Sequence, residues 1–392
     1  MRQSALNQLN DIPVRYPITT RTVCDALEAR SYPDIEVLVT DGLSRQWDRD
    51  LTLFNDSVYD QANFLGEKLW GPNRLSQLVL KQNGQPIAAA QIFLFQVTRD
   101  FGGGIAYAKF GPLWRPKGTK PNVTVYRLAC QALIEEYAIR RKLCLTIAPG
   151  PDPVYGSQQV DVLNELGFVR KRDITAALRY MVDVNLDLAE QRKSLSSKWR
   201  YNLKKSEKND IDVTFLQDDA ARQAFRDLHE EMRARKNYKE KTWADEFDEV
   251  ADKIPDKLRP NVVLARNEGR AVAGAVVGAI GDTAIYLFGG SSREGLDLRA
   301  GYLLQWEIIR KLTSDPDVRW YDLDNDAFGN PGLRQFKSGL VGRRGVIFEL
   351  PGEFEYCCHR RSRITADLVQ GLRQGRNLFQ TTLDNLRHRM GH

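Results

Sequence analysis

The residues best suited to chemistry lie near the end of one predicted strand and on the helix that follows it. Asp322, Asp324 and Asp326 alternate along this strand and its exit, so they point to the same face. One of them, Asp322 foremost, can accept a proton from an attacking amine, whereas a capping or turn role is favoured for Asp324 and Asp326. Lys337 follows Phe336, whose ring we expect in the core. Its charge suits a developing oxyanion, and a solvated lysine is the alternative.

A basic stripe lies between the two halves of the chain. Arg200, Lys204 and Lys208 are spaced four residues apart, beside an apolar stripe of Leu195, Trp199 and Leu203. This geometry suits the diphosphate of a nucleotide-linked or lipid-linked substrate, which Arg200 can bind through two hydrogen bonds. A solvated helix face explains the pattern equally well.

Familiar cofactor motifs are missing from the sequence. The loop 291–301 precedes a helix, as the pyrophosphate loop of CoA-dependent GNAT enzymes does, but only one residue separates Arg293 from Gly295, so their glycine pattern is absent. We see no nucleophilic triad, P-loop or dinucleotide fingerprint. We therefore predict no bound cofactor.

The overall composition is that of a globular protein with an anionic partner. The 392 residues favour two domains, and the 42% hydrophobic and 28% charged residues are ordinary proportions. A net charge of +6 and a pI of about 8.9 suit an anionic small-molecule or lipid-linked acceptor, tRNA, or an acidic membrane surface.

Cysteines, histidines and apolar runs give further exclusions. The number of cysteines, five, is odd, and none of them form a C-x-x-C pair, so a disulfide framework is not expected. Only His359 lies beside cysteines, and adjacent residues rarely chelate one ion, so no metal site is predicted. The longest apolar run, residues 271–281, is too short to span a bilayer, and the N-terminus lacks an apolar signal region. We expect a cytoplasmic protein.

The first half reads as a mixed α/β unit. Strands are predicted at 34–39, 77–81, 86–95, 105–110, 143–147 and 167–169, with helices at 123–142 and 160–166. The dipeptide Asn83-Gly84 between two apolar runs predicts a tight hairpin.

The same order of elements returns in the second half. Strands are predicted at 211–216, 262–266, 271–280, 283–288, 318–323 and 346–350, with helices at 299–313 and 332–340. We therefore expect two copies of one α/β fold, each a mostly antiparallel sheet flanked by helices. The predicted boundaries are an N-terminal extension 1–33, domain 34–186, basic linking helix 187–210, domain 211–355 and basic helical tail 356–392.

Three segments resemble the Fem family of aminoacyltransferases. They are the basic helix Ser196–Val213, the strand Trp320–Asp324 followed by Asn330–Gly339 with its Phe-Lys pair, and Phe110-Gly111-Pro112 at the end of a strand. The resemblance implies two tandem GNAT-like domains. It also implies transfer of an amino acid from aminoacyl-tRNA to an amine of a peptidoglycan precursor.

The resemblance also assigns roles to residues. Lys337 corresponds to the lysine that matters for activity in the family, and Arg200 to an arginine that contacts phosphate. Phe336, Phe110 and Gly111 fall in the segments that we expect to form the substrate site. Related bacterial proteins occur near polysaccharide genes.

Two alternatives stay open beside acyl or aminoacyl transfer to a peptidoglycan or polysaccharide precursor. One is a CoA-dependent N-acyltransferase that acts on an amino sugar of an exopolysaccharide, which the absent CoA pattern disfavours. The other is a non-catalytic GNAT-like protein that binds an anionic partner through residues 193–208 and the arginine-rich tail, which the Phe336-Lys337 pair disfavours.

Overall fold

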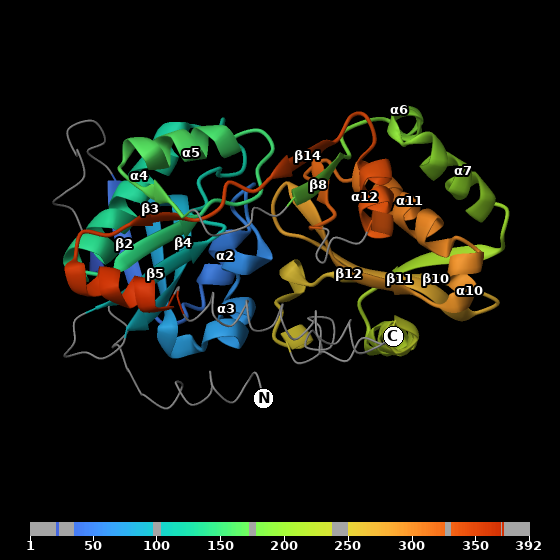
Figure 1. The fold of residues 1–392 in the computed structure, drawn as a ribbon, viewed down its shortest axis with the longest axis horizontal. Coiled ribbons are helices and arrows are strands. Elements are labelled where there is room, and N and C mark those ends of the chain that lie inside the picture. The colour runs from blue at the N-terminus through green and yellow to red at the C-terminus, as the bar shows by residue number, and fades with distance from the viewer. Residues whose placement is uncertain are drawn as a thin grey trace.

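The computed structural model describes residues 21–22, 35–96, 103–171, 178–236, 250–325, 331–369 and 371. These residues form two mixed sheets that lie side by side, each flanked by helices (Figure 1). The predicted fold of two α/β halves is therefore confirmed. Most of the N-terminal extension, Asp326 and residues 372–392 of the tail lie outside the described residues.

The first sheet has eight strands in the order β1-β2-β3-β4-β5-β6-β15-β7, and only the β5–β6 pair is parallel. Its strands are β1 (Arg21–Thr22), β2 (Ile35–Asp41), β3 (Leu75–Gln82), β4 (Gln85–Gln96), β5 (Gly104–Lys109), β6 (Cys144–Ala148), β7 (Val169–Arg170) and β15 (Phe354–Tyr356). The predicted Asn-Gly hairpin joins β3 to β4. Asn83 and Gly84 both have the positive φ, 52° and 75°, that such a two-residue turn requires.

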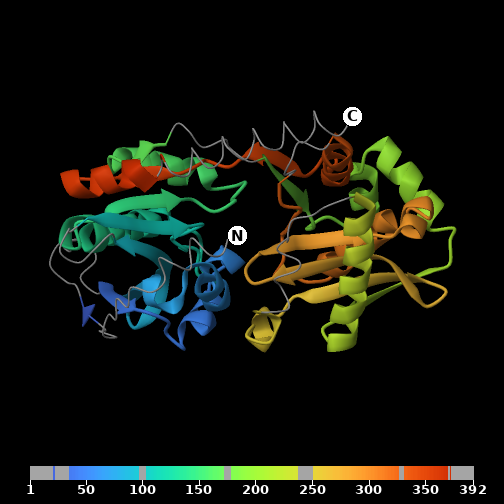
Figure 2. The same cartoon turned by 60° about the horizontal axis from the view of Figure 1, so that its bottom comes forward.

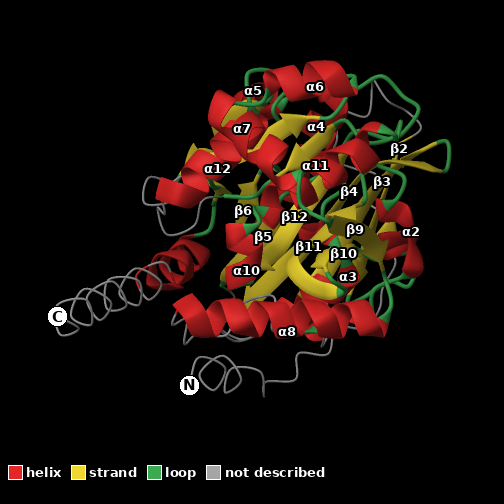
Figure 3. Ribbon diagram, turned by 90° about the vertical axis from the view of Figure 1, so that its right-hand side faces the viewer, coloured by secondary structure: helices red, strands yellow, loops and turns green. Residues whose placement is uncertain are grey.

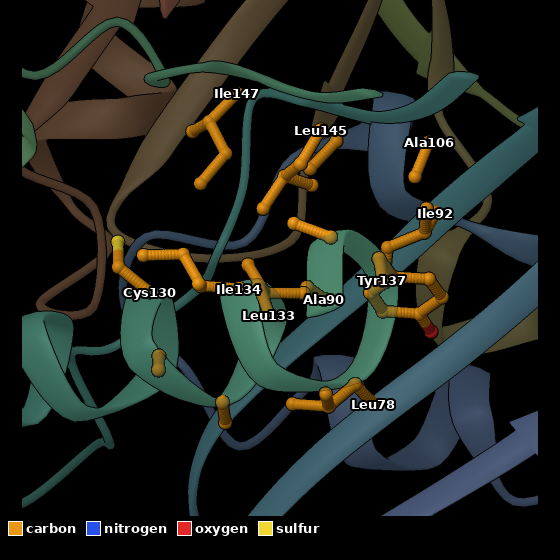
Figure 4. Close-up of a cluster of buried hydrophobic side chains, with 14 of the residues drawn as sticks. Leu78, Ala90, Ile92, Ala106, Cys130, Leu133, Ile134, Tyr137, Leu145 and Ile147 are labelled. Atoms are coloured by element: carbon orange, nitrogen blue, oxygen red, sulfur yellow. The ribbon is translucent and has the colours of Figure 1, made fainter. Parts of the chain in front are cut away.

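Helices cover both faces of this sheet. On one face lie α4 (Val123–Leu133), its π-helical continuation (Ile134–Arg140) and α5 (Gly156–Glu165). Figure 4 shows Leu133 and Tyr137 of this helix facing Ile92 and Leu145 of the strands. Side chains of the short helices α2 (Trp47–Leu51) and α3 (Asn63–Trp70) join a separate core, to which β3 contributes Val79. Three 3-10 turns occupy Tyr59–Gln61, Pro72–Arg74 and Asp256–Leu258.

The second sheet repeats this plan with seven strands in the order β14-β8-β13-β12-β11-β10-β9. The strands are β8 (Leu178–Asp183), β9 (Ile211–Leu216), β10 (Asn261–Asn267), β11 (Arg270–Ala279), β12 (Thr283–Ser291), β13 (Trp320–Asp322) and β14 (Val346–Glu349). The single parallel pair is β12–β13, at the place that β5–β6 takes in the first sheet.

Two layers of helices enclose the second sheet. One layer contains α6 (Leu188–Ser194), α7 (Ser197–Ser206), α11 (Ala300–Thr313) and α12 (Pro331–Val341). On the other side α8 (Asp219–Lys236) runs across the strands (Figures 2 and 3). The short helix α10 (Arg293–Asp297) precedes α11.

The two halves exchange one strand. β8 follows β7 along the chain but pairs with β13 and β14, and β15 follows β14 but pairs with β6 and β7. The sheets therefore depart from the predicted ranges 34–186 and 211–355. The reason is that the buried side chains of β8, Tyr180 and Val182, fill the second core, whereas Phe354 of β15 fills the first.

The predicted linking helix 187–210 is two helices. Leu195 and Ser196 have extended ψ values of 149° and 155°, and the Ser196 hydroxyl accepts a hydrogen bond from the Trp199 amide, which starts α7. Of the tail, residues 360–369 are helical, and the Ser362 hydroxyl there donates to the Lys142 carbonyl of the first half.

A third core joins the halves. Trp47, Phe54 and Tyr59 of the first half pack with Val276 and Ile280 of the second in one buried cluster. Among the described residues no helix is long and apolar enough to cross a membrane.

Candidate active site between the two halves

A cavity of about 40 Å³ lies where the two halves meet, with room for roughly three water molecules. The loops after β5 and β6 contribute Phe110, Arg115 and Asp152, and the second half contributes Thr283 and Asp322. Arg179 of the exchanged strand β8 also lines it. The cavity therefore needs both halves and the exchange to be complete.

Asp322 is the last residue of β13 and is 1% exposed. Its Oδ1 accepts a hydrogen bond from the Asp324 amide at 2.8 Å, and its Oδ2 lies 3.5 Å from Arg179 Nε. Burial raises the pKa of this carboxyl, Asp60 adds to the rise, and the charges of Arg179 and Lys337 oppose it. Asp322 is thus a carboxylate that binds a proton more readily than an exposed aspartate does.

Lys337 lies at the exit of the same strand, as the sequence predicts, but it is not a solvated lysine. Its side chain is 5% exposed, and Nζ donates to the carbonyl oxygens of Leu323 and Asn325, each at 2.5 Å. The lysine does not line the cavity. Its charge holds the backbone that follows Asp322 and favours the ionised form of that carboxyl.

The loop after β5 brings Phe110 to the cavity. Phe110 has a φ of 54°, and its amide donates to the Ala148 carbonyl at 2.7 Å. The guanidinium of Arg179 lies 5.7 Å from the centre of the Phe110 ring. Gly111 does not line the cavity; it lies against Gln61, where an added Cβ would come within 3.1 Å of the side-chain amide.

Arg115 is the centre of a second charged cluster. Its Nη1 lies 2.7 Å from Asp282 Oδ2 across the two halves, and its Nε lies 3.3 Å from Asp152 Oδ2. Asp56 accepts hydrogen bonds from the backbone amides of Trp114 and Arg115 at 2.9 and 3.1 Å. Burial nevertheless raises the pKa of Asp56 to about 6, against the charge of Arg115.

The cavity lining carries more acid than base. Among the described residues that line it, the charged ones are four acids and two bases, namely Asp56, Asp60, Asp152 and Asp322 against Arg115 and Arg179. Gln159 also lines it, and its buried Oε1 has no hydrogen-bond partner. An excess of carboxylates in a narrow, largely buried site attracts a cation, and an ammonium group is of a suitable size.

The predicted basic stripe does not reach the cavity. The Arg200 guanidinium donates to the carbonyls of Lys193 and Leu195 and so satisfies the end of α6. Lys204 is exposed on α7, whereas Lys208 lies beyond the end of that helix at Ser206, so the helical stripe is shorter than predicted.

Phe336 is also away from the cavity. Its ring packs against Trp199 and Tyr302, with ring centres 5.8 and 5.1 Å apart, which matches its expected place in the core. Asp324 has a φ of 60° and pairs with Arg179, in keeping with the favoured turn role.

Sequence reasoning missed four of the charged residues that line the cavity. Asp56, Arg115, Asp152 and Arg179 stand far apart in the chain and in no recognisable spacing. The available signal was local: the Gly-Pro after β5, and the proline- and glycine-rich turn that contains Asp152 after β6. Within the described ranges no group of three or more His, Cys, Asp or Glu side chains is placed to hold a metal ion.

Residues 189–338 match the family model of the GNAT acetyltransferase domain. The matched range contains α7, Asp322 and Lys337. No curated protein is a significant match to the sequence.

Solved structures share the fold of most of the chain. FemX matches with a TM-score of 0.67 at 15% identity, over 83% of this chain and 98% of FemX. L-PGS from Bacillus licheniformis matches with a TM-score of 0.51 at 14% identity, over 85% of this chain and 97% of that one. A conserved protein of unknown function from Bacteroides thetaiotaomicron VPI-5482 matches with a TM-score of 0.52 at 13% identity, over 82% and 99%. The predicted Fem-like tandem GNAT fold is thereby confirmed.

Proposed function

We propose that this protein is an N-acyltransferase that transfers an acyl or aminoacyl group to an amine of a cell-envelope precursor. The observation that carries the proposal is the acidic cavity between the halves, with the buried carboxylate of Asp322 on its wall. The match of the second half to acetyltransferase domains supports the reaction class. The resemblance to the Fem family suggests the precursor.

The cavity suits the amine of the acceptor. An aliphatic amine is an ammonium ion at neutral pH, and a lining with more carboxylates than guanidinium groups favours this form. It must lose a proton before or during attack. Asp322 accepts one proton from the ammonium group, which frees the lone pair of the nitrogen. The nitrogen then bonds to the acyl carbon, the bond to the leaving oxygen or sulfur of the donor breaks, and a second proton passes from the nitrogen to that leaving atom. A carboxyl with a raised pKa is a better match to this task at neutral pH than an ordinary aspartate.

Lys337 serves this reaction through its charge. It holds the two carbonyls after Asp322, and it stabilises the ionised carboxylate. The direct oxyanion contact that its charge suggests stays a prediction, because Lys337 lies outside the cavity lining. Arg200 likewise stays a candidate for a phosphate contact of the acceptor, beside its bonds to the end of α6.

Two acyl donors follow from different observations. The match to acetyltransferase domains favours an acyl-CoA, and an amino sugar is then the alternative acceptor. The Fem-like fold favours aminoacyl-tRNA. The loop that would bind CoA pyrophosphate contains only the five-residue helix α10, whose first turn is capped by Ser292.

The test is product detection by mass spectrometry. The protein is incubated with a UDP-linked peptidoglycan precursor or an amino sugar, and with either acetyl-CoA or charged tRNA. The proposal expects a mass gain of one acyl or aminoacyl group on an acceptor amine, and thermal stabilisation by the same substrates. Stabilisation by an anionic ligand without any product in all four combinations would favour the non-catalytic alternative.

A further inference from the structure

Two thiols face each other where the exchanged strand β15 joins the first sheet. β15 pairs with β6 in antiparallel register, with Tyr356 opposite Leu145. The next residue on each side places Cys357 opposite Cys144, the first residue of β6. Side chains directly opposite each other on antiparallel strands have Cβ atoms about 5 Å apart, close to the spacing that a disulfide needs.

The two thiols differ in exposure and in the direction of their pKa shifts. Cys144 is fully buried, whereas Cys357 is half-buried and reachable from solvent. A hydrogen bond between the thiols lowers the pKa of Cys357 and raises that of Cys144, and the charge of Arg363 further favours the Cys357 thiolate. The charge of Glu355 raises the pKa of both thiols. Cys357 is therefore the thiol that reacts first with an oxidant.

We propose that Cys144 and Cys357 form a reversible disulfide when the protein meets a peroxide. The Cys357 thiolate attacks one peroxide oxygen, the O–O bond breaks, and a sulfenic acid and one water form. Cys144 then attacks the Cys357 sulfur, the S–O bond breaks, and a second water leaves. Two thiols are oxidised and one hydrogen peroxide is reduced. This inference is independent of the proposed acyl transfer.

The position of the pair gives the bond a structural consequence. β15 is the strand that returns from the second half to complete the first sheet. A bond from Cys357 to Cys144 closes a loop that contains the entire second half, and it fixes β15 in place. Closing a long loop restricts the unfolded chain and stabilises the folded one.

The neighbouring Cys358 provides the internal control. It is exposed, and its sulfur lies 3.5 Å from the Ala138 carbonyl oxygen. Because trypsin leaves Cys357 and Cys358 in one peptide, only a variant can assign the bond. Cys358→Ser removes the competing thiol, and Cys357→Ser removes the proposed one at a half-buried site.

The experiment oxidises the full chain with hydrogen peroxide, blocks the remaining thiols and maps non-reduced peptides by mass spectrometry. We expect a peptide pair that joins Cys144 to the 357–358 peptide in wild type and in Cys358→Ser, and that disappears on reduction. The pair should be absent from Cys357→Ser. Oxidation should raise Tm by roughly 5 °C in wild type and Cys358→Ser but not in Cys357→Ser. A bond from Cys357 to any other cysteine, or persistence of free Cys144 under peroxide, would overturn the proposal.

Discussion

Asp322 and Lys337 show how burial changes what a residue does. Both were found from the sequence, Asp322 by alternation along a strand and Lys337 by its place after Phe336 and by the Fem resemblance. Their burial was not predictable, because it depends on packing between segments far apart in the chain. Asp56 and Asp152 were missed for the same reason: each is a single acid in a loop until the fold brings it to Arg115.

Replacing Lys337 by methionine should affect both stability and turnover. Replacement of an exposed lysine would lower the free energy of unfolding by about half a kcal/mol at most. Here two buried carbonyl groups lose their hydrogen-bond donor, which should lower the free energy of unfolding by about 1–3 kcal/mol for each carbonyl. Turnover should fall roughly a hundredfold, and the acid limb of the pH–rate profile should move to higher pH because the pKa of Asp322 rises further. Lys337→Arg keeps the charge and should retain partial activity. Full activity in Lys337→Met would refute any role for its charge.

Asp56 should make the protein less stable as pH rises from about 4 to 6. Its folded pKa of about 6 lies above the ordinary value of 3.8, so the folded state binds a proton that the unfolded state has already lost. The ionised carboxyl therefore costs folding free energy above pH 6, on the order of 3 kcal/mol, and this cost disappears as pH falls. Chemical denaturation at pH 4 and pH 7 measures most of this cost. In Asp56→Asn the difference between the two pH values should shrink; an unchanged difference would contradict the assignment.

At the scale of elements, periodicity located most strands and helices but not their partners. The predicted range of β9 matches the structure residue for residue. The sequence did not predict β8 and β15 as strands, nor that the two halves exchange them. A sequence pattern reports which side chains are buried, but it does not report which sheet covers Tyr180 and Val182 of β8. The exchange is therefore a property of tertiary packing.

Phe354→Ala tests the exchange. Phe354 is 1% exposed in the core of the first half, so its truncation should cost about 3–5 kcal/mol. Hydrogen exchange should quicken in β6, its neighbour in the sheet, before it quickens in β13. Ile364→Ala, on the following helix, is the control. The Ile364 side chain is 46% exposed, so its truncation should lower the free energy of unfolding by less than about 0.5 kcal/mol. Faster exchange confined to the second sheet would contradict the observed pairing.

At the scale of the molecule, the halves act as one unit because a shared core and close backbone contacts join them. The Asp282 amide donates to the Asn55 carbonyl at 2.6 Å, next to the Arg115–Asp282 ion pair. Under the proposed function, we expect the net charge of +6 to favour the anionic body of a substrate and the acidic cavity to favour its amine.

Gly281→Ala should disrupt the backbone contact between Asn55 and Asp282. A Cβ at Gly281 would lie 2.1 Å from the Asn55 carbonyl oxygen, which is backbone and cannot rotate away. We expect a loss of about 1–3 kcal/mol in unfolding free energy and a fall in activity, because the cavity spans both halves. Gly156→Ala, at the open start of α5, is the matched control and should be neutral. Wild-type stability and activity in Gly281→Ala would show that the halves can move apart without consequence.

The central claim is that Asp322 accepts the proton of an amine bound in the acidic cavity. The most direct measurement is the rate of amide formation by wild type and Asp322→Asn across pH, with Asp297→Asn, an exposed acid on α10, as the matched control. Asparagine has the shape of aspartate but no charge, and burial disfavours the charged form of Asp322. The Tm of Asp322→Asn should therefore change little. We predict that Asp322→Asn lowers kcat by roughly a hundredfold or more, as expected for loss of a general base, and abolishes the acid limb, which in wild type lies above the ordinary aspartate value of 3.8. Wild-type kcat with an unchanged acid limb in Asp322→Asn would contradict the account.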